Sequence, residues 1–93
     1  MIKDKQTAIY DVAIIYYQPK TMLRRRLRTD NVELAKTAWE KAGKDVYQQY
    51  LHGDLSVTQT RRQLGWLTTS YDIRSESKNI LLAQVVFSKV AQS

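Results

Sequence analysis

The chain has 93 residues, 43% of them hydrophobic, which is enough to close one core and predicts a single compact domain, residues 1–93. Lys and Arg number 15 against 9 Asp and Glu, and the formal net charge of +6 favours anionic partners. The absence of cysteine excludes disulfides and thiolate chemistry, and no apolar run is long enough for a membrane-spanning helix, so we expect a cytoplasmic protein without a membrane partner.

The segment Thr7–Tyr17 is dense in β-branched and aromatic residues, which favour the pleated surface of a β-sheet. A turn is predicted at Gln18–Thr21, because proline presets the backbone for an early turn position. Met22–Thr29 is then expected to pair back as a second strand. Its alternation predicts a core-facing set and a solvent-facing set, namely Leu23, Arg25 and Leu27 against Arg24, Arg26 and Arg28.

A long helix is predicted from Asp30 to His52. Asp30 followed by Glu33 is typical of a capping box, which places the helix start at Asp30 and separates the preceding segment from the helix. Gly43 is expected to bend or end this helix, because glycine is unfavourable in a helix interior. Apolar residues recur at helical spacing on one side, namely Val32, Ala35, Trp39, Ala42, Val46, Tyr47, Tyr50 and Leu51.

Two shorter elements are expected after this helix. Asp54 or Ser56 would cap a short helix over Val57–Leu64, which Gly65 would close. The segment Trp66–Ile73 has few periodic cues and indicates a loop or a short strand. The last segment, Asn79–Ala91, has a helical apolar face, although its centre would also suit a strand. Its apolar content indicates either a central core element or a surface buried in a homo-oligomer.

These elements predict an α+β fold in which an N-terminal β-hairpin packs on a long central helix with short C-terminal helices. The alternative is an all-α small helical bundle with residues 8–17 as its buried helix. A helix-turn-helix over Gly53–Ile73 is disfavoured, because Arg61 stands where that motif packs a small residue between its helices.

The candidate binding residues are basic. Four arginines occur within five positions, and guanidinium groups present planar donor forks that match phosphates and carboxylates. The alternative interpretation is a solvated basic face that pairs with Asp30, Glu33 or Asp11. The predicted site for nucleic acid or another anionic partner consists of Lys20, Arg24, Arg25, Arg26, Arg28, Arg61 and Arg62.

The residue types needed for catalysis are sparse. His52 is the single histidine, and with no cysteine the chain offers no recognisable metal-ligand set. It also contains no nucleophile–base pair and no phosphate-cradling Gly-rich loop. We therefore expect no catalytic residues, no cofactor and no enzyme activity.

The composition favours a small binding module that contacts DNA or RNA phosphates through the arginine cluster. The aromatic residues that lie between basic segments, such as Tyr17 and Trp66, would also suit stacking on unpaired bases. The alternative is a protein-interaction or inhibitor module, of phage or mobile-element type, whose basic patch docks on an acidic protein surface.

Overall fold

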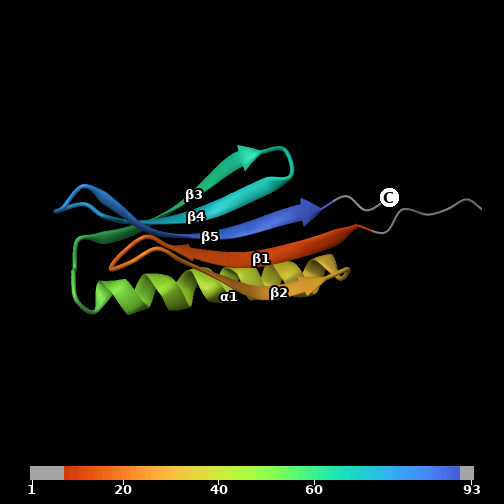
Figure 1. Cartoon of the computed structure of the whole chain (residues 1–93), viewed down its shortest axis with the longest axis horizontal. Coiled ribbons are helices and arrows are strands. Elements are labelled where there is room, and N and C mark those ends of the chain that lie inside the picture. The colour runs from red at the N-terminus through yellow and green to blue at the C-terminus, as the bar shows by residue number, and fades with distance from the viewer. Residues whose placement is uncertain (1–7, 91–93) are drawn as a thin grey trace, which may run out of the picture.

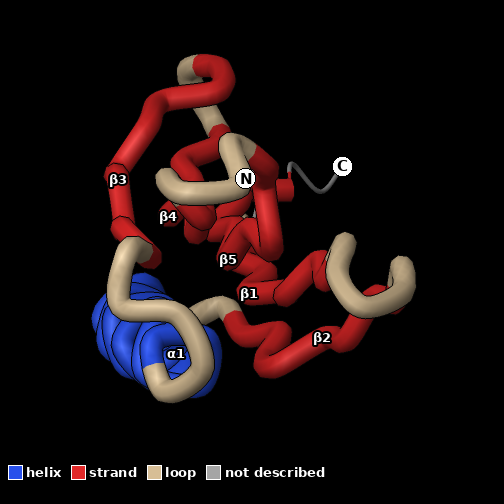
Figure 2. Tube along the Cα trace, turned by 90° about the vertical axis from the view of Figure 1, so that its left-hand side faces the viewer, coloured by secondary structure: helices blue, strands red, loops and turns tan. Residues whose placement is uncertain are grey.

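The computed structural model describes residues 8–90, which form a five-stranded antiparallel sheet with one helix along it (Figure 1). The strands are ordered β2-β1-β5-β4-β3, so the last strand is central and β2 and β3 are the edges (Figure 2). Pairing of β1 with β5 joins the N-terminal hairpin to the C-terminal one. The elements are β1 (Ile9–Tyr16), β2 (Met22–Thr29), α1 (Val32–Leu51), β3 (Val57–Gly65), β4 (Thr68–Ser75) and β5 (Ile80–Val90).

The predicted short C-terminal helices are wrong, and so is the arrangement built on them. Val57–Leu64 belongs to β3, and Ile80–Val90 of the segment Asn79–Ala91 forms β5. Trp66–Ile73, for which a loop or a short strand was predicted, forms the hairpin turn and most of β4. The five-stranded sheet also overturns the all-α alternative, and the Gly53–Ile73 segment forms a hairpin instead of a helix-turn-helix corner. Asp, Ser and Gly in this part of the chain were interpreted as helix caps, but these residue types favour turns as much as helix ends. Thr7 and Ala91, the outer ends of two predicted segments, lie outside the described residues.

The long helix is present but begins later than predicted. Its N-cap is Asn31, whose side-chain oxygen accepts a hydrogen bond from the Leu34 backbone N–H at 3.0 Å. The Asn31 backbone N–H in turn donates to the Thr29 hydroxyl at 3.1 Å, which joins the end of β2 to the helix start. The expected capping box at Asp30 is therefore replaced by an asparagine cap one residue later, and α1 continues through Gly43 without a break.

Trp39 fastens the helix to the sheet. Its indole N–H donates to the Val85 carbonyl of β5 at 2.8 Å, and both groups are buried. The indole ring stacks on Tyr71 of β4, with ring centroids 4.1 Å apart and an interplanar angle of 16°. Phe87 of β5 meets the same ring in a tilted arrangement. One side chain thus satisfies its polar atom and buries its apolar surface against two central strands. The core around it consists of Val12, Ile14, Ala35, Ala42, Val46, Val57, Ile73, Leu82, Ala83 and Val85.

Gly43 is required by this packing. It is buried on the sheet-facing side of α1, and a Cβ atom placed there would lie 2.5 Å from the Cδ2 atom of Tyr71. A shift of the Tyr71 ring to make room would disturb its stacking on Trp39. The glycine that weakens the helix by propensity therefore allows the helix to approach the sheet closely.

We predict that Gly43→Ala destabilises the protein by about 1–2 kcal/mol, because overpacking against Tyr71 outweighs the helix propensity that alanine gains. Urea denaturation measures this change. Gly53→Ala is the matched control, since a Cβ there meets nothing within 4 Å and the residue lies outside the helix. A Gly43→Ala variant as stable as the parent protein would show that Tyr71 does not hold this contact.

Asp54, in the loop after α1, joins that loop to the end of β4. One of its carboxylate oxygens accepts from the backbone N–H and the hydroxyl of Ser56, at 2.9 and 2.6 Å. The other oxygen accepts from the Ser75 hydroxyl at 2.6 Å. These hydrogen bonds from Ser56 and Ser75, together with the charge of Lys78, lower the pKa of Asp54 to about 2.

This shift predicts a specific loss of stability in acid. Because the pKa of Asp54 is lower in the folded protein than in the unfolded chain, its contribution is complete above about pH 4 and is lost as the pH falls toward 2. We expect the urea midpoint of the parent protein to fall more between pH 4 and pH 2 than that of Asp54→Asn. Parallel pH profiles for the two proteins would contradict the assignment.

Candidate anion-binding face

A β-bulge in β2 divides the arginine cluster between the two faces of the sheet. The pairing register between β1 and β2 shifts by one residue between Arg25 and Leu27, which leaves Arg26 without a cross-strand partner. Leu27 packs against the core, and the Arg26 Nη2 atom contacts the Asp45 carboxylate of α1 at 3.1 Å. Two adjacent residues therefore point to the helix side, and the alternation is reversed beyond them.

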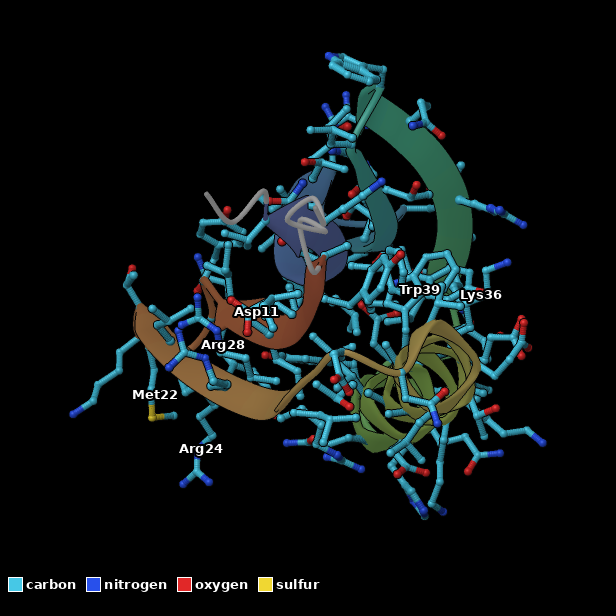
Figure 3. The ribbon with its side chains drawn as sticks, turned by 90° about the vertical axis from the view of Figure 1, so that its right-hand side faces the viewer. Asp11, Met22, Arg24, Arg28, Lys36 and Trp39 are labelled. Carbon is cyan, nitrogen blue, oxygen red and sulfur yellow. The ribbon has the colours of Figure 1, made fainter. Side chains whose placement is uncertain are left out.

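The predicted assignment of arginines to faces is therefore wrong. Arg25 and Arg28 pair with Ala13 and Asp11 of β1, which point away from the helix, whereas Arg24 pairs with the buried Ile14 on the helix side. In Figure 3, Arg28 lies beside Asp11, and Arg24 extends from the opposite side of β2. Period-2 alternation alone would have kept Arg24, Arg26 and Arg28 together, and the bulge separates them.

The sheet surface opposite α1, here called the helix-free face, has arginines at both edges. One row of paired residues crosses all five strands in the order Arg25, Ala13, Val86, Ser70 and Arg62. The two arginines stand at the ends of the row, on strands β2 and β3, and the three residues between them are small or medium-sized. Four strand spacings place the two outer backbones about 19 Å apart along the sheet.

Carboxylates on the same face hold two of these arginines in place. The Nε atom of Arg25 lies 3.1 Å from an oxygen of Asp11, and the Nε atom of Arg62 lies 2.9 Å from an oxygen of Asp72. The arginine side chains are 58% and 56% exposed, whereas the carboxylate side chains are 17% and 10% exposed. Each carboxylate therefore lies beneath its guanidinium. Since both contacts use Nε, the terminal amino groups of Arg25 and Arg62 remain for a second anion.

A polar network underlies Arg62. One oxygen of Asp72 accepts from the Ser70 hydroxyl at 2.8 Å and from the Gln84 amide at 3.0 Å. The Gln84 carbonyl accepts from the Tyr17 hydroxyl at 2.7 Å, so the network extends from the end of β1 to β3. Among the described residues no buried side-chain polar atom lacks a partner. A satisfied network of this kind fixes the carboxylate, and through it the guanidinium above.

Asp11 is one of the carboxylates that the alternative interpretation of the arginine cluster named, and it pairs with Arg25. Asp72 and Gln84 were not predicted from the sequence as supports for Arg62. A usable signal existed in residues 68–75, where Ser70 and Asp72 alternate with Tyr71 and Ile73. That period of two predicts a strand with a polar face. Nothing in the sequence alone indicated which arginines these polar residues would meet.

The remaining predicted residues lie on the helix side. Lys20 and Arg24 line a cavity of about 370 Å³ between the β1–β2 turn and the end of α1, together with Met22 and Tyr50. Burial, and to a lesser extent the neighbouring Tyr16, raises the pKa of Tyr50 above its ordinary value.

Arg61 lies on the other edge of the sheet, far from this cavity along the strand order. Its guanidinium carbon is 5.4 Å from the centroid of the Trp39 ring, on the helix side of β3. The structure therefore brings Arg25 and Arg28 together, places Arg62 across from them on the same face, and separates Lys20, Arg24, Arg26 and Arg61 from that face.

Within residues 8–90 no three His, Cys, Asp or Glu side chains are grouped to hold a metal ion. The one described helix is too polar to cross a membrane. Comparisons with protein families, with curated protein sequences and with solved structures find no match to this chain.

We predict that Asp72→Ala destabilises the protein by about 2–3 kcal/mol, because buried donors of Gln84 and Ser70 lose a charged acceptor. Asp11→Ala is the matched control with the same change of charge, and we expect it to cost less than about 1 kcal/mol because its partner Arg25 is largely solvated. Urea denaturation of both variants tests the difference. Equal losses would mean that the network under Arg62 does not stabilise the fold.

Proposed function

We propose that this protein is a small non-enzymatic module that binds nucleic acid in the cytoplasm through phosphate contacts on the helix-free face. The observation that carries the proposal is the pair of anchored arginines, Arg25 and Arg62, at opposite ends of one row of residues. Arg28 stands beside Arg25 and makes no ion pair with any described residue. The wider set of seven basic residues is thereby narrowed to three.

The chemistry of these arginines suits phosphate. A guanidinium held through Nε keeps its two terminal amino groups for bidentate contact with phosphate oxygens. Because Asp11 and Asp72 already fix the side chains, binding requires little further loss of side-chain freedom. The net charge of +6 adds long-range attraction to any polyanion.

The floor between the arginines favours nucleic acid over an acidic protein surface. The two rows that contain Arg25 and Arg28 carry small or medium-sized side chains between their ends, with Val86 and Ser88 at the centre, and the second row also contains Asp11 beside Arg28. Protein interfaces concentrate their binding energy in central aromatic or arginine anchors that fill pockets. Small side chains flanked by cations instead suit a phosphate backbone, whose affinity comes from charge neutralisation.

The salt dependence of binding tests the proposal. We expect the parent protein to bind mixed-sequence oligonucleotides, with log K falling linearly with log salt concentration. In the triple variant Arg25→Gln, Arg28→Gln, Arg62→Gln the magnitude of that slope should fall by roughly 2–3, since each lost phosphate contact removes about 0.7–0.9. Fluorescence anisotropy at several salt concentrations measures both slopes.

The opposite face of the same strands provides a matched control, because Arg24→Gln, Arg26→Gln, Arg61→Gln removes the same charge from β2 and β3. We expect this variant to keep most of the slope. Arg28→Gln alone leaves no carboxylate without its partner, so it reports a slope change of about 0.7–0.9 even if the triple variant folds poorly. An equal decrease in both triple variants, or no oligonucleotide binding by the parent protein, would overturn the proposal.

A further inference from the structure

Trp66 is the most exposed aromatic residue within residues 8–90, and it lies at the tip of the β3–β4 hairpin. Trp66 is 87% exposed, whereas Trp39, in the core, is 4% exposed. Gly65 pairs with Thr68, so Trp66 and Leu67 form a two-residue turn. Tryptophan offers the largest apolar surface of any side chain, so this exposed indole is available for contact with another molecule.

The hairpin tip is braced by hydrogen bonds on both sides of the turn that carries Trp66. The Lys89 backbone N–H of β5 donates to the Leu67 carbonyl at 2.9 Å. The Gln63 amide donates to the Gly65 carbonyl, and the Gln63 carbonyl accepts from the Thr69 hydroxyl at 3.2 Å. These hydrogen bonds hold both sides of the turn. The tip is therefore tied to β5 and to the two strands that flank it, at one end of the sheet.

The braced tip lies at the same end of the sheet as Arg28. A second row of paired residues crosses the sheet in the order Arg28, Asp11, Ser88, Thr68 and Gly65. Trp66 follows this row directly, and Arg62 lies four residues before Trp66 on β3.

The strand that leads to the tip carries positive charge and no acidic residue. Arg61 and Arg62 are its charged side chains, and its sequence Val57–Gly65 contains neither Asp nor Glu. A flat apolar ring beside such a strand, at the end of the face that carries Arg25, Arg28 and Arg62, suits a ligand that combines negative charge with exposed aromatic rings.

We propose that Trp66 stacks on an unpaired base of a nucleic acid whose phosphates contact the helix-free face, so the ligand is single-stranded or has a single-stranded end. The inference rests on the proposed function. Stacking on an indole tolerates any base, because every base has a π-face. In an intact duplex the base faces are covered by neighbouring pairs, and the indole would lack this contact.

Substitutions at Trp66 separate ring stacking from general hydrophobicity. We expect Trp66→Ala and Trp66→Leu to weaken binding of a mixed-sequence single-stranded DNA oligonucleotide by about 5- to 150-fold, and Trp66→Phe to retain most of the affinity. Binding of the blunt-ended duplex should change little. The salt slope should stay unchanged, because no charge is removed. Leu64→Ala is the matched control, since Leu64 lies on β3 two residues before Trp66 and is also exposed, at 45%.

The outcomes distinguish this inference from the function on which it rests. A parent protein that binds single strands with the expected salt slope, but is indifferent to Trp66→Ala, would overturn the stacking role and leave the phosphate contacts standing. An equal loss for single strand and duplex would also overturn the preference for unpaired bases. Failure of the parent protein to bind any oligonucleotide would overturn both proposals. In the Trp66→Ala variant, the intrinsic fluorescence of Trp39 reports whether the core is intact.

Discussion

The structure depends on the way in which Trp39 joins the helix to the middle of the sheet. Its indole donates to Val85 of the central strand and stacks on Tyr71 of the next strand, and Gly43 leaves the space for that ring. A single helix can cover only one side of a five-stranded sheet. Once these contacts fix α1 on one side, the other side must be closed by its own side chains or remain available to a partner (Figure 2).

Among the described residues, the helix-free face carries a polar network beside apolar side chains such as Val86, and no second helix. The network of Tyr17, Gln84 and Asp72 shields the central strands and ends at Arg62, while Asp11 performs a similar role for Arg25. The two carboxylates contact the Nε atoms of the guanidinium groups, and the terminal amino groups make no ion pair with a described residue. Structural support and the proposed ligand contacts therefore use the same residues, which accounts for arginines at sites where a lysine would offer no second donor pair.

The N-terminal strands and the long helix follow from local sequence, because β-branched density at Ile9–Tyr16 and helical spacing at Val32–Leu51 are strong local signals. The C-terminal strands do not, since Val57–Gly65 is polar and flanked by residues that suit turns and helix caps equally. Its strand state is set by pairing with β4. The bulge at Arg26 is likewise a property of pairing, so the sequence could indicate a basic cluster without indicating which of its members share a face.

The contact surface can be observed directly by titrating ¹⁵N-labelled protein with a single-stranded oligonucleotide and following its ¹H–¹⁵N spectrum. The account predicts shifts for the side-chain Nε–H groups of Arg25 and Arg62 and for the indole N–H of Trp66. We expect unchanged signals for the indole N–H of Trp39, which donates to Val85, and for the amides on the solvent side of α1. Shifts concentrated on α1, or on the helix side of β2, would contradict binding at the helix-free face.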